Sequence, residues 1–315
     1  MTDSVPTPSS GVLTIEGECS GFACASYQYG SKSTNLGYCN CITAVTEWGN
    51  ITRIPNHAFR DCSKLAISAV PDGVTSIGDY AFYNCSNITL ATLPSGVTSI
   101  GSYAFYNCNK IALTSLPSGI TSIGDYVFYN CSNITLATLP SGVTSIESFA
   151  FYGCTNLALT SLPSGVTSIK DNTFYRCANM NLRTLAGITN IESYALAYTP
   201  MAEADSLTLP EGVTTIGQYA FTSSDDSVLK EINIPSTVTS IGGCAFHING
   251  AVRGRTVNIL AETPPILGVN DQGAYSNFDR IEGVTIKVPT GCGAAYKADE
   301  SWVASGYAAR VVEGL

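Results

Sequence analysis

The sequence is short of charge and of long apolar runs, and each shortage excludes a class of protein. Asp, Glu, Lys and Arg make up only 12% of the 315 residues, where about a quarter is usual. With 15 basic against 24 acidic residues the net charge is −9, which repels phosphate backbones. No apolar run approaches the ~20 residues of a membrane span, and the first ten residues lack the basic start and apolar core of a secretory signal. We therefore expect neither nucleic acid as a partner nor insertion into a membrane.

What the sequence has is a repeat. Residues 76–100 recur at residues 122–146, with Val127 in place of Ala81 as the only change. The underlying unit is 23 residues long, because a phenylalanine recurs at that interval and a cysteine follows each one three positions later. A fixed period in the twenties is typical of a solenoid, in which each turn stacks on the last. The six pairs are Phe59 and Cys62, Phe82 and Cys85, Phe105 and Cys108, Phe128 and Cys131, Phe151 and Cys154, and Phe174 and Cys177.

The repeat continues less strictly through Leu196, Phe221 and Phe246, which predicts about nine turns. Residues 111–117 place apolar side chains at alternate positions and end at a proline, a pattern that predicts one short strand per turn. Residues 125–129 are expected to form a tight, 3₁₀-like turn that carries Phe128 into the core. We therefore expect a solenoid over residues 50–255, with an N-terminal cap over 1–49 and a C-terminal capping segment over 256–315.

The C-terminal segment carries a helical pattern of its own. Ala295, Ala298 and Trp302 lie at positions i, i+3 and i+7, which predicts a helix over residues 293–303 whose apolar stripe covers the last turn.

The repeated pattern V-T-S-I-G-x-Y-A-F-Y-x-C, with a following segment that ends in L-P, resembles the BspA-like leucine-rich repeat family of bacterial surface proteins. The resemblance spans about residues 51–248 and implies a right-handed leucine-rich-repeat-like stack. Residues 257–268 and 284–302 resemble the closing segment of that family. Two stretches depart from the pattern: the unit around Leu196 lacks both Phe and Cys, and Asp225 and Asp226 stand where the turn is expected to be irregular.

The residues that usually carry catalysis are scarce. His57 and His247 are the two histidines, and about eight turns at ~4.8 Å per strand would separate them by about 40 Å, too far to share a metal or a proton. Glycines occupy S-G-V and I-G-D corners, not the spacing of a phosphate-binding loop. Carboxylates such as Asp79, Asp125 and Glu147 recur once per turn, which suits a solvated corner better than an acid/base pair. We expect no enzyme activity, no cofactor and no metal.

Ten of the twelve cysteines fall into two groups. The six that recur with the phenylalanines are interpreted as buried free thiols, because Cys packs as a small apolar group. A second group stands ahead of the repeats. It either joins an N-terminal cap by disulfides or stays reduced, and a zinc site is the weakest of the three options because the C-x₄-C and C-x-C spacings differ from a C-x₂-C knuckle. These four are Cys19, Cys24, Cys39 and Cys41.

Tyrosines recur on either side of the core phenylalanine and could line one flank of the stack. Partly exposed tyrosines are good contacts for proteins or sugars, whereas a simpler interpretation is that the rings pack on one another and shield the stack. The candidate ligand-binding residues are Tyr80, Tyr83, Tyr103, Tyr106, Tyr126, Tyr129, Tyr152 and Tyr175.

Two functional hypotheses follow. The first, which the resemblance implies, is a non-catalytic adhesion protein that attaches a bacterial cell surface to host protein or glycan. The alternative is a phage or prophage tail component, a virion protein that binds a receptor on a bacterial envelope and forms a homo-oligomer. Expected locations are accordingly extracellular or cell-surface, or the virion.

Overall fold

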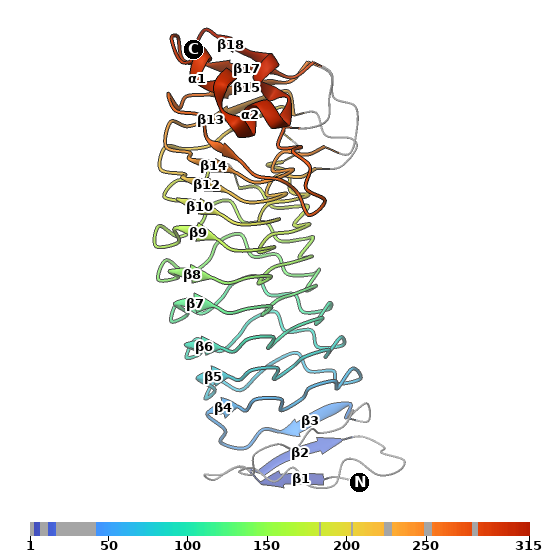
Figure 1. Cartoon of the computed structure of the whole chain (residues 1–315). Helices are drawn as coiled ribbons and strands as arrows, with labels where there is room; N and C mark the ends of the chain where they lie inside the picture. The colour runs from blue at the N-terminus through green and yellow to red at the C-terminus, as the bar shows by residue number, and fades with distance from the viewer. Residues whose placement is uncertain are drawn as a thin grey trace. The chain divides into compact units, whose positions relative to one another are not determined.

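The fold is seen in a computed structural model that describes residues 3–6, 12–16, 42–182, 184–202, 204–223, 229–248, 254–278 and 283–315 (Figure 1). The chain divides into two compact units, residues 1–159 and 160–315, which we call unit 1 and unit 2. Within the described ranges, no helix has the length and apolar character needed to cross a membrane. The four N-terminal cysteines and the Asp225–Asp226 pair of the sequence predictions lie outside the described residues.

Unit 1 begins with an antiparallel sheet and continues as a stack of turns. The sheet consists of β1 (Asp3–Pro6), β2 (Val12–Glu16) and β3 (Ala44–Glu47). Each turn then contributes a two-residue strand that pairs in parallel with a neighbour 23 residues away, as in Ser76 with Ser99. These strands are β4 (Arg53–Ile54), β5 (Ser76–Ile77), β6 (Ser99–Ile100), β7 (Ser122–Ile123) and β8 (Ser145–Ile146).

The described residues of unit 2 form two parallel sheets. The first continues the short-strand pattern with β9 (Ser168–Ile169), β10 (Asn190–Ile191), β12 (Thr215–Ile216), β14 (Ser240–Ile241) and β16 (Ile266–Leu267). The second contains β11 (Ser206–Thr208), β13 (Glu231–Ile234), β15 (Thr256–Ile259), β17 (Thr285–Val288) and β18 (Val311–Glu313). The short strands thus mark five turns in each unit, ten in the described residues. The predicted solenoid of about nine turns is confirmed as a fold class.

The predicted position of the strand is wrong in unit 1. Residues 111–117 are not a strand, although they contact both neighbouring turns. The Ala112 and Thr114 N–H groups donate to Leu90 O and Ala91 O at 3.0 and 3.3 Å, and Leu113 O accepts from the Thr135 N–H group at 3.0 Å. The strand of that turn is β7, at Ser122–Ile123. Alternating apolar residues report burial, and Ile111 and Leu113 are indeed buried. An extended segment buries alternate side chains whether or not it forms a full ladder, so the pattern alone did not locate the strand.

A column of parallel phenylalanine rings forms the centre of unit 1. Phe82, Phe105, Phe128 and Phe151 have no exposed surface, and consecutive ring centroids are 5.4 to 5.7 Å apart. In unit 2, Phe221, Phe246 and Phe278 stack in the same way at 5.4 and 5.9 Å. The predicted burial of the repeated rings is confirmed within each unit.

The tight turn around each phenylalanine determines which side chains point outward. Its N–H groups donate alternately to the carbonyl three residues back, as Tyr106 does to Tyr103 O at 3.2 Å, and to the next turn, as Phe105 does to Val127 O at 3.0 Å. This satisfies the backbone without a helix. Tyr103 and Asn107 have φ of 59° and 56°, and their equivalents in neighbouring turns are also left-handed. The turn therefore exposes a tyrosine and an asparagine on either side of the buried ring.

The repeated cysteines are buried free thiols, as predicted. Each Sγ in the regular turns donates to the carbonyl of a phenylalanine in the preceding turn, for example Cys131 to Phe105 O at 3.0 Å. Burial raises the pKa of these thiols well above the ordinary value. They stay protonated and unreactive, and they pack the core.

The single predicted C-terminal helix is wrong. Two short helices replace it, α1 (Gly293–Ala298) and α2 (Glu300–Ser305), followed by η1 (Tyr307–Arg310). The break has a local cause: the Asp299 side chain accepts hydrogen bonds from the Ser301 and Trp302 N–H groups and begins a new helix. Ala295 and Ala298 are exposed, whereas Tyr296 and Trp302 are buried. Tyr296 Oη donates to Ala261 O at 2.7 Å and Trp302 Nε1 to Pro265 O at 2.9 Å, which joins both helices to unit 2.

Candidate binding surface

Two columns of aromatic rings run along one flank of unit 1, and we call them the tyrosine columns. Consecutive rings lie face to face, with centroids 4.5 to 4.6 Å apart in the first column and 4.5 to 4.7 Å apart in the second. Rings of different columns contact each other at a tilt, 5.6 to 6.5 Å apart. The first column is Tyr80, Tyr103, Tyr126 and Phe149; the second is Tyr83, Tyr106, Tyr129 and Tyr152.

Seven of the eight tyrosines predicted from sequence therefore lie together. The eighth, Tyr175, belongs to unit 2, where it contacts Tyr194 and Tyr198 edge-on at 6.2 and 5.3 Å. Tyr194 itself stacks on Tyr219 at 4.7 Å. The sequence prediction did not include Tyr194, Tyr198 or Tyr219. Tyr194 and Tyr219 nevertheless stand two residues before Leu196 and Phe221, as Tyr80 does before Phe82.

Stacking limits what the tyrosine columns can offer to a partner. Every ring of the tyrosine columns is half-buried, and consecutive rings of a column cover each other's faces. What a partner meets is ring edges and phenolic hydroxyls. Burial, followed by the neighbouring tyrosines or Asp125, raises the pKa of the hydroxyls of Tyr103, Tyr106, Tyr126 and Tyr129. The hydroxyls are therefore neutral donors and acceptors at every physiological pH.

The N-terminal end of the columns is closed by a cation. Arg60 occupies the position of Tyr83 in its own turn, and its guanidinium carbon lies 5.2 and 5.1 Å from the ring centroids of Tyr80 and Tyr83. His57 stacks on Tyr80 at 4.9 Å. Burial, and secondarily Arg60, lowers the pKa of His57, so the imidazole that ends the first column is neutral at pH 7.

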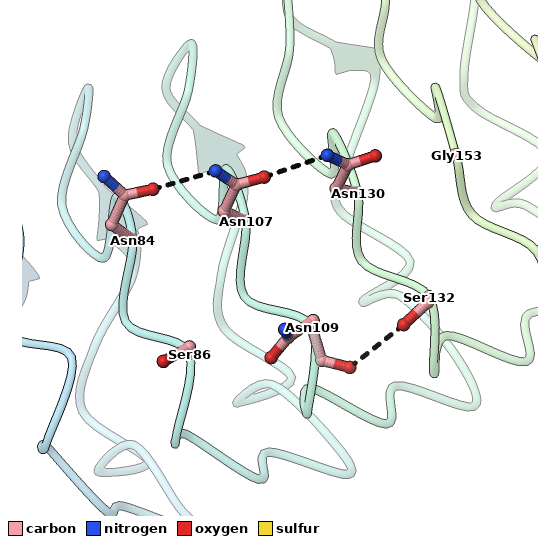
Figure 2. Close-up of a pocket in the computed structure, with 7 residues that line it drawn as sticks. All are labelled: Asn84, Ser86, Asn107, Asn109, Asn130, Ser132 and Gly153. Carbon is pink, nitrogen blue, oxygen red and sulfur yellow. Dashed lines mark hydrogen bonds between the residues drawn. The ribbon is translucent and has the colours of Figure 1, made fainter.

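An amide ladder, which was not predicted from the sequence, runs parallel to the columns. The side-chain Nδ2 of Asn130 donates to Asn107 Oδ1 at 3.1 Å, and that of Asn107 donates to Asn84 Oδ1 at 3.0 Å (Figure 2). Asn84 Nδ2 in turn donates to Asp61 Oδ1 at 2.8 Å. Each asparagine immediately follows a tyrosine of the second column and has a positive φ. Asn tolerates that conformation better than other side chains. The recurrence of asparagine every 23 residues was the available signal in the sequence. That recurrence is also explained by the preference of asparagine for tight turns, so it did not by itself indicate a ladder.

The amide ladder forms one wall of a groove in unit 1, and a second polar row forms the other, as Figure 2 shows. The groove has a volume of about 520 Å³ and is lined by Asn84, Asn107, Asn130, Ser86, Asn109, Ser132 and Gly153. We call it the amide groove. It contains amides and hydroxyls but neither charged nor apolar side chains. Among the residues that the structure describes, no group of three or more His, Cys, Asp or Glu side chains could hold a metal ion.

The comparisons with known proteins identify a repeat family. The description "BspA type Leucine rich repeat region" matches in six copies, over residues 33–144 and 121–252, which together exceed half of the chain. No significant relative is found among curated proteins.

Solved structures with a similar chain include three bacterial proteins. A leucine-rich cell surface protein of Faecalibacterium prausnitzii is 23% identical, with 94% of this chain and 95% of that one covered and a TM-score of 0.47. The leucine-rich repeat protein of T. pallidum is 27% identical over 49% of this chain and 75% of that one, with a TM-score of 0.40. The pneumococcal vaccine antigen PcpA is 18% identical over 76% and 62%, with a TM-score of 0.45.

Proposed function

Because the chain belongs to the BspA-type leucine-rich repeat family, whose members are typically cell-surface proteins, we propose that it is a non-catalytic adhesion protein of a bacterial surface. It works outside the cell and attaches to protein or glycan on a host surface, with the flank of unit 1 as its contact. Nucleic acid and inserted lipid are not partners in this proposal, and no cofactor takes part. The virion alternative has no structural observation of its own and stays a prediction.

The observation that carries the proposal is the repetition of one half-exposed aromatic pair through four successive turns. The rings hold one another in place, so their hydroxyls form a regular, rigid array that loses little side-chain entropy on contact. One hydroxyl contact is weak, but several such contacts to a repetitive surface add in avidity. A reaction centre needs different groups at one point, whereas identical turns present the same groups again. The proposal of a non-enzyme rests on this difference.

The test separates the hydroxyls from the rings. Tyr83, Tyr106, Tyr129 and Tyr152 have no positive φ, so substitution there does not strain the backbone. Changing all four to Phe keeps the stack, as Phe149 does in the first column, and removes only hydroxyls. Changing all four to Ser removes the column. We expect attachment of the purified protein to candidate host cells to fall at least about tenfold in the Phe variant, and further in the Ser variant, once circular dichroism confirms folding. Unchanged attachment by both folded variants contradicts the proposal.

A further inference from the structure

We propose that the amide groove is a binding site for a neutral oligosaccharide, lying beside the tyrosine columns. The inference rests on the proposed function and deepens it, because it assigns a ligand class and a set of residues other than the tyrosines. The volume of the amide groove, about 520 Å³, falls within the range of about 300 to 1,000 Å³ typical of small-molecule sites.

The first wall offers paired donors and acceptors in a fixed direction. A side-chain amide has two N–H donors and an oxygen that accepts twice. The ladder uses one N–H and one acceptor position of Asn84 and of Asn107, which leaves one donor and one acceptor of each for a ligand. The ladder also orients every amide alike, with Nδ2 toward the N-terminal turn. A sugar with adjacent hydroxyls, each both donor and acceptor, matches this alternation.

The C-terminal end of the ladder has an unused acceptor. Asn130 Oδ1 would receive a bond from an asparagine in the next turn, but Gly153 stands there, with a φ of 69°. A Cβ at this position would overlap Asn130 Oδ1, so the glycine keeps the end of the ladder open. In the part of the chain that the structure describes, no donor reaches this oxygen. At the N-terminal end of the ladder, Asp61 Oδ1 accepts from Asn84. At the C-terminal end the ladder stops at Asn130 Oδ1, an oxygen that favours a hydroxyl or amide donor from a ligand.

The second wall is also suited to sugar hydroxyls. Ser132 Oγ donates to Asn109 O at 3.4 Å and Ser86 Oγ to Ser63 O at 3.5 Å, so both hydroxyls keep their lone pairs for incoming donors. The Asn109 side-chain amide makes no hydrogen bond to the described residues, and its donors and acceptor are both available. The two walls together line the groove with groups that bind neutral hydroxyls.

Charge and polarity favour this ligand over the alternatives. Anionic glycans and phosphates are usually bound by Lys or Arg, and the lining of the groove has neither. A peptide in an extended groove is usually anchored by apolar side-chain pockets or by a free strand edge, and no apolar side chain lines this groove. Tyr83, Tyr106 and Tyr129 each stand directly before a ladder asparagine in the sequence.

The test uses the full chain with two groove variants and their matched controls. Asn107→Gly with Asn130→Gly removes two amides and places at both positions the residue that the chain itself has at Gly153. Ser132→Trp fills the groove. Asn133→Ala and Thr138→Trp change exposed residues of the same turn that do not line the groove. Each protein is screened on an array of neutral gluco-, manno-, galacto-, xylo- and N-acetylglucosamine oligomers and of oligogalacturonate, and hits are titrated by calorimetry.

We expect a neutral series to bind the parent protein, with an affinity that changes less than about twofold between low and high salt. Both groove variants should weaken that binding at least about tenfold, and both controls should stay within about twofold. The inference is overturned if the folded parent binds no neutral oligomer, if it prefers oligogalacturonate, or if the groove variants bind as the parent does. The cell-attachment assay separates the two proposals. If attachment to cells depends on the column tyrosines but the parent protein binds no neutral oligosaccharide, only the proposal for the amide groove is refuted. If, in addition, attachment does not depend on the column tyrosines, the proposed function is refuted as well.

Discussion

Replacing Phe128 by alanine tests how the turns of unit 1 hold together. Phe128 is fully buried, and its ring lies between those of Phe105 and Phe151, with centroids at 5.7 and 5.5 Å. Burial of a phenylalanine side chain contributes about 1.5 to 3 kcal/mol. A residual cavity of about 80 Å³ would add about 2 kcal/mol, at about 24 cal/mol per Å³. We expect the free energy of unfolding to fall by about 3.5 to 5 kcal/mol.

The loss should be local, because a turn in a solenoid contacts only its neighbours. Amide hydrogen exchange followed by mass spectrometry measures it turn by turn, with urea unfolding for the total. The Phe105 and Phe128 N–H groups, which donate to Val127 O and Ala150 O at 3.0 and 2.9 Å, should exchange up to about a thousandfold faster. Residues 53–77 should change least.

Phe128→Leu is the matched control, because it keeps most of the apolar volume and should cost less than about 1.5 kcal/mol. A loss below about 1 kcal/mol for the alanine variant would contradict the reasoning, since the ring would then not be a packed core element. Equal acceleration of exchange throughout unit 1 would contradict the nearest-neighbour argument.

Three further predictions concern the thiols, one glycine and the C-terminal segment. The thiols of Cys85, Cys108, Cys131 and Cys154 should resist alkylation at pH 8 until denaturant is added, and labelling of the native protein would show that they are exposed. Burial raises the pKa of these thiols in the folded state. The stability that they contribute is therefore complete below the unfolded thiol pKa of about 8.5 and is lost as the pH rises above that value. A melting temperature that stays constant from pH 8 to above pH 10 would refute this linkage. Gly101→Ala should lower the unfolding free energy by about 1 to 3 kcal/mol, since the added Cβ would overlap the Asp79 backbone nitrogen. Gly96→Ala is the control: its Cβ would have no neighbour nearer than 3.9 Å, so it should change the unfolding free energy by less than about 0.5 kcal/mol. Equal melting curves for the two variants would contradict the prediction that close approach of the backbone requires Gly101. Deletion of residues 284–315 removes β17 and β18 and exposes the edge of β15, so the truncated chain should aggregate in size-exclusion chromatography, and a stable monomer would mean that the segment does not protect that edge.

The sequence was sufficient for the parts of the fold that each turn copies from its neighbour. Phe128 and Cys131 are buried because the same positions are buried in every regular turn, and a strict period makes such positions visible. The location of the strand was not visible, since Ile111 and Leu113 are buried on either side of the less buried Ala112 without forming a strand. The break at Asp299 was missed because the apolar stripe was weighed above the capping signal of a single aspartate.

The candidate site was predicted only in part for a similar reason. The tyrosines were recognised as one flank, but their face-to-face stacking depends on the distance between turns, which residue spacing does not give. The amide ladder needs both that distance and the left-handed backbone at Asn107. Gly153 gains its meaning only from the structure, as the place where the ladder stops.

Hydroxyl-radical footprinting of the protein, free and bound to its target cells, measures whether the flank of unit 1 is the contact surface. We expect oxidation of the four tyrosines of the second column, Tyr83, Tyr106, Tyr129 and Tyr152, to fall at least about fivefold on binding, because their edges become buried in an interface. The partly exposed Tyr275 of unit 2 should be oxidised equally in both states. Protection of Tyr275 with unchanged oxidation of the four column tyrosines would contradict the claim.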